Sequence, residues 1–423
     1  MRLMEAVVSS RVLLVAALLV AVLAVPAAVG AKTGSVRFAT FNASLNRNSA
    51  GQALSDLSAP GNAQADAVAE IIQRVRPDVL LINEFDYYPN NQLATAFQDN
   101  YLDVAHNGAA PIDYPYVFVA PSNTGQPSGL DLDNNGSVGG PNDAFGFGFF
   151  QGQYGLAVFS RYPIDADAVR TFQMFLWKDM PGALLPDNPT TATQADWYSP
   201  AELAVFRLSS KSHWDVPIEV GGQTVHFLVS HPTPPVFDDP PAFPAGVDFN
   251  GRRNSDEIRF WADYITPGPA SRYIYDDAGE SGGLKPGERF VIAGDQNSDP
   301  LDGDSIPGSI QQLIDHPLVN TKATPASDGG PYWAEAQDAL NDVHESDPLF
   351  DTADFCDTPV APPCSGPGNL RADYVLPRKN LQILGSGVFW PDGDDPLLYL
   401  TGTGFPVPSS DHRAVWVDVK ISG

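Results

Sequence analysis

Residues 290–297 read Phe-Val-Ile-Ala-Gly-Asp-Gln-Asn, an apolar run that ends in a glycine, a carboxylate and an amide. The run from Phe290 to Ala293 predicts a buried strand, and Gly294 permits a tight turn at its end. Asp295 and Asn297 lie two residues apart in an extended segment, so their side chains share one face. These two groups can hold a phosphate, a water or a metal ion, although a Gly-Asp-x-Asn string is more commonly an ordinary turn.

Apolar or alternating runs recur along the chain and predict further strands. These runs cover residues 35–41, 78–84, 155–160, 225–230, 372–376 and 414–419. Helical spacing of apolar residues occurs at 65–74 and 255–265, and long segments between these elements are rich in Gly, Pro, Asn and Asp. Many short strands, few helices and long loops predict an α/β sandwich of two mostly antiparallel sheets, rather than a parallel doubly wound sheet. With no internal repeat in the sequence, residues 32–423 are predicted to form a single domain with long loop insertions.

Polar side chains suited to acid, base or metal chemistry follow several of these strands. They are Asn42, Glu84, His231, Asp295 with Asn297, and Asp411 with His412. Strand ends on one side of a sandwich converge, so these residues are predicted to build one site. Glu84 ends a buried strand, and its carboxylate requires a partner there, either an arginine or a hard divalent cation such as Mg²⁺, Mn²⁺ or Ca²⁺. His231 and His412 are candidates for the acid and base of a hydrolytic step, because imidazole titrates near neutral pH.

The first 31 residues differ in kind from the rest of the chain. Arg2 and Arg11 precede an apolar run at residues 12–25, and small residues follow Pro26, which is the pattern of a cleaved secretory signal peptide at residues 1–31. An uncleaved anchor is the alternative, because the apolar segment approaches the length of about 20 residues that spans a bilayer. No later stretch is long and apolar enough to do so. We therefore expect a secreted protein without a transmembrane helix after processing.

The net charge of −27 at pH 7 disfavours a protein that binds nucleic acids through a basic surface. No stable nucleic-acid complex is expected. A nuclease is disfavoured but stays open, because a local cationic or metal-bearing cleft can act inside an acidic protein.

Two loops contain further candidate residues. Cys356 and Cys364 lie close together in a Pro/Gly-rich segment and, in an exported chain, predict a local disulfide. Asp131, Asp133 and Asn135 place oxygen atoms at alternate positions, and both a structural Ca²⁺ and a simple Asx-rich turn fit this pattern.

Basic and imidazole side chains elsewhere have mainly structural interpretations. Arg252 and Arg253 precede the predicted helix at 255–265 and could clamp a phosphate by bidentate contact, although solvated arginines are the commoner case. The other five histidines are expected to be structural: His106, His213, His226, His316 and His344.

Seven short motifs occur in a characteristic order. They are Thr40-Phe41-Asn42-Ala43, Asn83-Glu84, residues 155–164, Ser230-His231, Gly294-Asp295-Gln296-Asn297, residues 373–376 and Ser410-Asp411-His412. Each motif is weak alone, but the ordered set resembles the endonuclease/exonuclease/phosphatase superfamily with the deoxyribonuclease-like fold. The resemblance extends over residues 36–419. It implies a four-layer αββα sandwich with an active cleft at one edge of its paired sheets.

The resemblance also implies how a metal ion and a phosphate would be bound. Asn42 and Glu84 would hold a catalytic divalent ion, Mg²⁺ or else Mn²⁺ or Ca²⁺, with assistance from Asp411. Asp295 and Asn297 would position the phosphate and the attacking water.

Proton transfer would fall to the histidines. By the same resemblance, His412, oriented by Asp373, would act as general base, and His231 would donate to the phosphate or to the leaving oxygen. The expected activity is a secreted, divalent-metal-dependent phosphoric-ester hydrolase for a small or exposed phosphoester, such as a lipid or a nucleotide. An extracellular nuclease for DNA or RNA is the first alternative. A calcium-dependent surface-binding protein without catalysis is the second, and it predicts that catalytic groups are missing.

Overall fold

The computed structural model describes residues 34–238, 244, 246–356, 366–404 and 406–421. The chain from Gly34 onward groups as one compact unit. The predicted signal peptide at residues 1–31 lies outside the described residues. Within the described part of the chain, no helix has the length and apolar character needed to cross a membrane.

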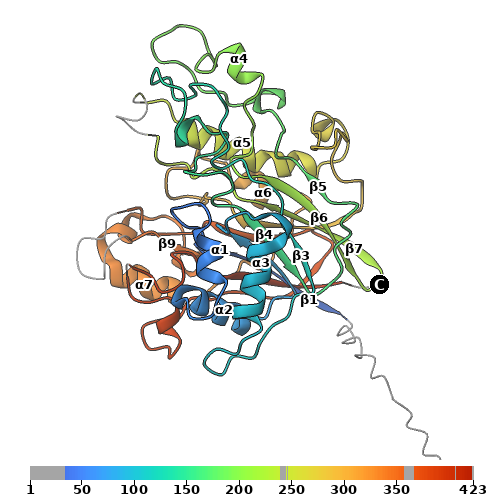
Figure 1. Cartoon of the computed structure of the whole chain (residues 1–423), viewed down its shortest axis with the longest axis vertical. Helices are drawn as coiled ribbons and strands as arrows, with labels where there is room; N and C mark the ends of the chain where they lie inside the picture. Colours follow the sequence, from blue (N-terminus) through green and yellow to red (C-terminus); the bar gives the residue numbers. More distant parts are fainter. Residues whose placement is uncertain (1–33, 239–243, 245, 357–365, 405, 422–423) are drawn as a thin grey trace, which may run out of the picture. The chain divides into compact units, whose positions relative to one another are not determined.

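Two mixed sheets form the centre of this unit (Figure 1). The first has the strand order β12 (Gln382–Val388), β13 (Val415–Lys420), β1 (Ser35–Asn42), β2 (Val79–Asn83), β4 (Leu156–Ser160) and β3 (Tyr116–Phe118). The second has the order β11 (Asp373–Pro377), β8 (Arg289–Asp295), β7 (Gln223–Ser230), β6 (His213–Val220) and β5 (Arg170–Thr171). Among the described pairs, β1–β2 and β7–β8 are parallel and the others are antiparallel. The predicted pair of mostly antiparallel sheets is confirmed.

Alternation along the strands separates the faces of each sheet. In β1, Phe38 packs between the two sheets, together with Val229 of β7 and Val291 of β8. The intervening Ala39 and Phe41 point the other way, into an apolar cluster with the helices. This alternation follows from the two-residue period of a strand.

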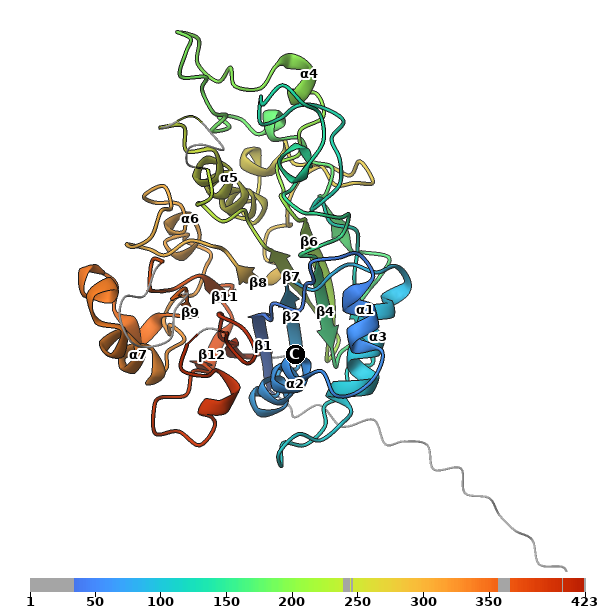
Figure 2. The same ribbon diagram turned by 60° about the vertical axis from the view of Figure 1, so that its left-hand side comes forward.

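Helices cover the outer face of each sheet. The first sheet is covered by α1 (Gln52–Leu57), α2 (Ala63–Val75) and α3 (Gln92–Phe97). The second is covered by α5 (Phe249–Tyr264) and α6 (Gln311–Ile314). Both views place the strands between these two groups of helices (Figures 1 and 2). The order helix, sheet, sheet, helix is the predicted four-layer sandwich.

Shorter elements lie in the connections. They are the helices α4 (Pro200–Leu203) and α7 (Gly329–Gln337), and the two-stranded ribbon of β9 (Ala353–Asp354) and β10 (Asn369–Leu370).

The predicted start of the helix at 255–265 is wrong, because α5 begins at Phe249. The helix buries polar side chains as far as Glu257, among them Arg253 and Asn254. These side chains form hydrogen bonds with neighbouring loops. An apolar stripe therefore appears only in the second half of the helix, where Ile258 and Trp261 pack on the second sheet.

Candidate active site

Asp295, the last residue of β8, lies at the centre of a buried polar cluster. Its Oδ2 accepts a hydrogen bond from Nδ2 of Asn42 at 3.0 Å. The same oxygen lies 3.3 Å from Nε2 of His231 and 3.6 Å from Nε2 of His412. Burial alone would raise the pKa of Asp295, but the two histidines and Asn42 outweigh burial and hold this pKa well below its usual value. Asp295 is therefore a carboxylate at neutral pH.

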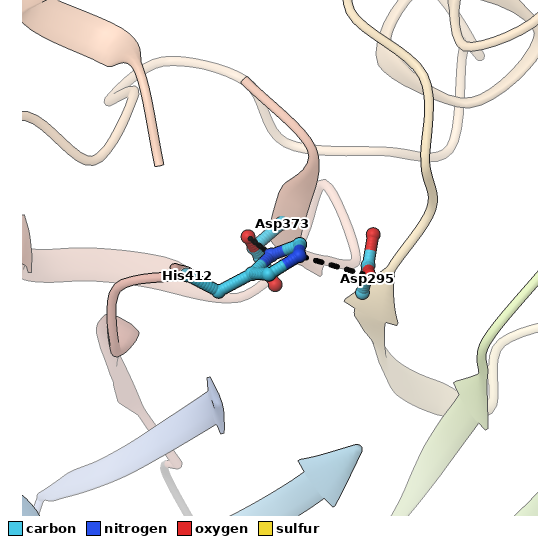
Figure 3. A group of neighbouring side chains, drawn as sticks. All are labelled: Asp295, Asp373 and His412. Carbon is cyan, nitrogen blue, oxygen red and sulfur yellow. Dashed lines mark hydrogen bonds and ion pairs between the residues drawn. The ribbon is translucent and has the colours of Figure 1, made fainter. Parts of the chain in front are cut away.

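His412 stands between two carboxylates (Figure 3). Its Nδ1 donates to Oδ2 of Asp373 at 2.8 Å, and its Nε2 faces Asp295. Asp373 is directly opposite Asp295 in the β8–β11 pair, and Thr352 also donates to its Oδ2, at 2.9 Å. Burial lowers the pKa of His412, but the two carboxylates outweigh burial and raise this pKa well above its usual value. The arrangement fixes the orientation of the His412 ring and keeps a proton on its Nδ1, directed at Asp373.

His231, which directly follows β7, is held in the neutral form. Burial, followed by the nearby ammonium of Lys211, lowers the pKa of His231 to about 4, against the opposing effect of Asp295. Because Nε2 faces the Asp295 carboxylate, the single ring proton belongs on Nε2. At neutral pH His231 can donate a hydrogen bond there, but it does not carry a positive charge.

Gly294 allows the ends of β7 and β8 to approach each other. Its φ is +148°, and a Cβ at this position would lie 2.0 Å from the carbonyl oxygen of Ser230. No side chain fits in that space. The glycine therefore lets Asp295 lie beside His231, which follows Ser230 in the chain.

Glu84, Asn42 and Asp411 form an oxygen-rich group next to this centre. Nδ2 of Asn46 donates to Oε2 of Glu84 at 2.7 Å, and Ser44 donates to Oδ1 of Asp411 at 3.3 Å. Burial, and then the Asp411 carboxylate, raise the pKa of Glu84 to about 7. Two carboxylates that repel each other beside an amide oxygen fit a hard divalent cation, which would neutralise both.

A second set of potential ligands is less suited to a metal ion. Asp295, Asp373 and His412 place ligand atoms within 4.8 Å of one another. However, two of these three groups are already joined to each other by the hydrogen bond from Nδ1 of His412 to Asp373 at 2.8 Å, which is the arrangement of a base and the carboxylate that orients it. We therefore assign this set to proton handling, and the group around Glu84 to the metal ion.

Asn297, two residues after Asp295 in the chain, has a left-handed backbone conformation with φ of +50°. Its backbone N–H donates to Oδ1 of Asp295 at 2.8 Å, and its Nδ2 donates to the carbonyl of Pro232 at 3.2 Å. The structure thus brings Asn297 to the segment that carries His231.

Lys211 is a charged residue of this site that the sequence analysis missed. It is 93% buried, with 7% of its surface exposed, and its Nζ donates to the carbonyl of Pro232 at 3.4 Å. Burial lowers the pKa of Lys211, and Glu257, Glu84 and Asp295 oppose that effect. A lone lysine between serines carries no motif signal. Its position beside Glu84 and Asp295 arises from packing of distant segments.

Glu257 of α5 holds the two segments that carry Lys211 and His231. Its Oε1 accepts from the backbone N–H of Ser210 at 2.6 Å, and its Oε2 accepts from that of Thr233 at 2.7 Å. This carboxylate fixes both segments relative to the second sheet.

The phosphate clamp of Arg252 and Arg253 stays a prediction, although the described hydrogen bonds of Arg253 are structural. The Arg253 guanidinium donates to three backbone carbonyls, those of Leu208, Phe145 and Arg207, so it serves to hold these segments together. Arg252 is half-buried on the same helix, and no described contact links it to Asp295 or Glu84.

In the candidate calcium loop, the residue that lies with Asp131 and Asp133 is Asp143 rather than Asn135. Asp131, Asp133 and Asp143 place oxygens within 4.8 Å of one another. Asn135 instead donates its side-chain amide to Asp133 at 2.9 Å and accepts from the backbone N–H of Ser137 at 2.9 Å. Asp143 lies farther along the chain, outside the alternating pattern that marked this loop.

The predicted disulfide stays a prediction, because Cys364 lies outside the described residues. Cys356 is buried, and its backbone N–H donates to Oδ1 of Asp354 at 3.1 Å.

Comparison with known proteins assigns the chain to a family. A family model described as "Endonuclease/Exonuclease/phosphatase family" matches residues 39–412. The chain belongs to this family. Members of the endonuclease/exonuclease/phosphatase family are phosphoester hydrolases, and the resemblance inferred from the seven motifs is confirmed. No curated protein matches the chain in sequence.

Solved structures of endonuclease/exonuclease/phosphatase proteins resemble this member at low sequence identity. A protein of this family from Beutenbergia cavernae DSM 12333 is 14% identical with a TM-score of 0.46, covering 92% of this chain and 72% of its own. A family protein from Leptotrichia buccalis C-1013-b is 14% identical with a TM-score of 0.45, covering 91% and 100%. Sphingomyelinase C from Streptomyces griseocarneus is 16% identical with a TM-score of 0.42, covering 91% and 99%. The family assignment rests on the sequence match to the family model.

Proposed function

We propose that this chain is a secreted, divalent-cation-dependent hydrolase of small or exposed phosphoesters. The observation that carries the proposal is the convergence of Asn42, His231 and His412 on one oxygen of Asp295. Three strand ends contribute to this centre, and an oxygen-rich group around Glu84 lies beside it. The second alternative, a non-catalytic calcium-dependent binding protein, predicts that such groups are missing. The signal-peptide pattern at residues 1–31 supports export.

The chain's own residues suggest how water is activated. Asp373 and Asp295 raise the pKa of His412 and so favour the imidazolium that proton transfer forms. In the neutral form of His412, Asp373 holds the ring proton on Nδ1, and Nε2 is the atom that takes a proton from the attacking water. Oδ2 of Asp295 lies 3.6 Å from this Nε2 and accepts the second hydrogen of the same water, which orients its lone pair toward phosphorus. The new P–O bond forms as the ester P–O bond breaks. The leaving alkoxide then takes up a proton from a solvent water, and the His412 imidazolium returns its proton to solvent.

Charge on the phosphoryl group is offset from two sides. Glu84, Asn42 and Asp411 would hold a divalent cation such as Mg²⁺, which when bound neutralises negative charge on the phosphoryl oxygens. On the other side, the ammonium group of Lys211 can donate to a phosphate oxygen, because its present hydrogen bond to Pro232 is long at 3.4 Å.

A panel of phosphoesters tests the proposal. The purified protein is incubated with bis-p-nitrophenyl phosphate, p-nitrophenyl phosphate, sphingomyelin and plasmid DNA, each with Mg²⁺ or with EDTA. We expect hydrolysis of at least one small ester or of the lipid with Mg²⁺, loss of that activity in EDTA and its return when Mg²⁺ is added back. Cleavage of plasmid DNA in preference to every small ester would favour the nuclease alternative.

A matched pair of histidine variants identifies the centre. His412→Ala should reduce the hydrolysis rate by at least about 100-fold, the lower range for loss of a general base. The control is His344→Gln, which changes a histidine that contacts the carbonyl of Pro367 and has no described contact with Asp295, His412 or Glu84. Activity that survives both chelation and His412→Ala would refute the proposed mechanism.

A further inference from the structure

A cavity of about 560 Å³ opens beside the proposed centre, and Glu84 forms part of its wall. The remaining wall comes from the long connections that the sequence analysis treated only as loops, together with the first turns of α5. Its size is in the range of cavities that bind small organic molecules. Because Glu84 belongs to both features, whatever fills the cavity lies next to the bound phosphate.

The end of the cavity near Glu84 has polar groups that are only partly satisfied. Lys211 and Thr233 both line the cavity and are both more than nine-tenths buried. The Lys211 ammonium has three donors and makes a hydrogen bond of 3.4 Å to Pro232, and the Thr233 hydroxyl has no hydrogen-bond partner among the described residues. A buried cation and a buried hydroxyl both gain from an anionic oxygen placed between them. These two groups point to a phosphate position.

The rest of the wall is dominated by aromatic rings. Six aromatic side chains line the cavity, namely Phe147, Tyr154, Tyr198, Phe206, Phe237 and Phe249. Flat rings of this kind bind other flat rings by offset stacking or edge-to-face contact.

The aromatic wall has a rigid part and an exposed part. Phe206 is buried between Tyr198, with ring centroids 4.7 Å apart, and the Arg253 guanidinium, which lies 4.8 Å from its ring centroid. Because Arg253 is fixed by three backbone carbonyls, this part of the wall is held in place. Phe147 and Phe237 are 51% and 81% exposed and lie where the cavity meets solvent.

Phe237 also has an unfavourable backbone conformation. Its φ is +72°, a region that bulky side chains rarely adopt. This conformation presents an apolar ring that is 81% exposed at the cavity mouth. Such strain is commonly found at ligand-binding positions.

We propose that this cavity binds the organic group of the phosphoester substrate, and that this group carries a flat aromatic ring. The inference rests on the proposed hydrolase function and specifies its substrate class. Lys211 and Thr233 contact the phosphate, while Phe206, Phe147 and Phe237 contact the ring. A nucleoside and a simple aryl group share the required chemistry.

Direct binding measurements test the proposal without requiring turnover. Non-hydrolysable phosphonates are titrated into the Mg²⁺-loaded protein by calorimetry, in two matched pairs. The first pair is 3-phenylpropylphosphonate and propylphosphonate, and the second is the 5′-phosphonate of thymidine and that of the same sugar without its base. We expect the ring-bearing member of at least one pair to bind roughly ten-fold more tightly, as one stacked ring gives. The pair with the larger ratio distinguishes an aryl group from a nucleoside.

Variants locate the ring and the phosphate separately. Phe237→Ala and Phe147→Ala should reduce the ratio within the preferred pair by several-fold. Lys211→Gln should weaken both members of the pair equally, because the phosphonate is common to them. Tyr332→Ala, which removes an exposed aromatic ring on α7 that is not among the described cavity-lining residues, should leave the ratio unchanged.

Three results would overturn the proposal. They are ratios below two-fold in both pairs, decylphosphonate binding as tightly as 3-phenylpropylphosphonate, or ratios that neither phenylalanine variant changes. Failure of the proposed hydrolase function would give a different result. If the protein binds ring-bearing phosphonates but hydrolyses no phosphoester, the cavity assignment stands and only the proposed catalysis is refuted.

Discussion

Replacing Asp373 by asparagine tests whether the Asp373–His412 pair drives proton transfer. The change keeps the shape of the side chain but removes the charge that faces Nδ1 of His412 at 2.8 Å. A hydrogen bond to a charged group contributes about 1.5–3 kcal/mol, which corresponds to about a ten- to 150-fold change in rate. If the side-chain oxygen of the asparagine still accepts the hydrogen bond from Nδ1 of His412, the rate should fall only by this factor.

A second effect adds to the first. If the asparagine turns its NH₂ group toward Nδ1, the ring proton must move to Nε2, and the proposed base is lost. We therefore expect Asp373→Asn to reduce kcat by at least about 100-fold. KM should change little, because Asp373 is not among the described residues that line the cavity.

The assay measures kcat and KM with the p-nitrophenyl ester that the wild type hydrolyses, alongside the melting temperature of each protein. Asp179→Asn is the matched control, since it removes a carboxylate paired with Lys178 at the surface. A folded Asp373→Asn protein whose kcat stays within three-fold of wild type would show that Asp373 does not orient a catalytic histidine.

Two further predictions concern stability. Glu257→Ala leaves the buried N–H groups of Ser210 and Thr233 without their acceptor. At about 1–3 kcal/mol for each group, this change should lower the unfolding free energy by about 2–6 kcal/mol in urea titration, and a loss below about 1 kcal/mol would contradict the role given to Glu257. His226 is partly buried, and burial would lower its pKa, but the Asp215 carboxylate at 2.8 Å outweighs burial and raises the pKa above the unfolded value. The stability from this pair is complete below about pH 6.5, the unfolded value, and is lost as the pH rises through the folded-state pKa. The difference in unfolding free energy between wild type and His226→Gln should therefore shrink between pH 6 and pH 9, and a difference that grows with pH would be inconsistent with this pairing.

Much of the fold could be predicted because its central strands have a clear apolar pattern. The runs at 35–41 and 78–84 became β1 and β2, and the run at 290–293 became the middle of β8. The strand β6 was missed, because Pro217 interrupts a segment that also carries Asp215 and Glu219, and proline normally argues against an interior strand. The early start of α5 was missed for a related reason, since its first turns bury polar groups that bind loops.

The candidate site was predictable where residues follow strands. Asn42, His231 and Asp295 each lie at or directly after the end of a strand, and the sandwich brings these ends together. Lys211 was not predictable, because nothing in its local sequence separates it from a solvated lysine. The same holds for Asp143, whose link to Asp131 depends on how one loop folds back on itself.

The proposed function requires a cation held by Glu84, Asn42 and Asp411 for phosphoester hydrolysis at Asp295. The most direct test is the initial rate of hydrolysis as a function of free Mg²⁺, for wild type and for Glu84→Gln, after both proteins have been treated with EDTA. We expect no hydrolysis without Mg²⁺, a saturable rise in rate for wild type, and a half-saturating Mg²⁺ concentration at least about ten-fold higher for Glu84→Gln, because one charged ligand is lost. A wild-type rate that is unaffected by EDTA, or identical half-saturating concentrations for the two proteins, would contradict the proposed function.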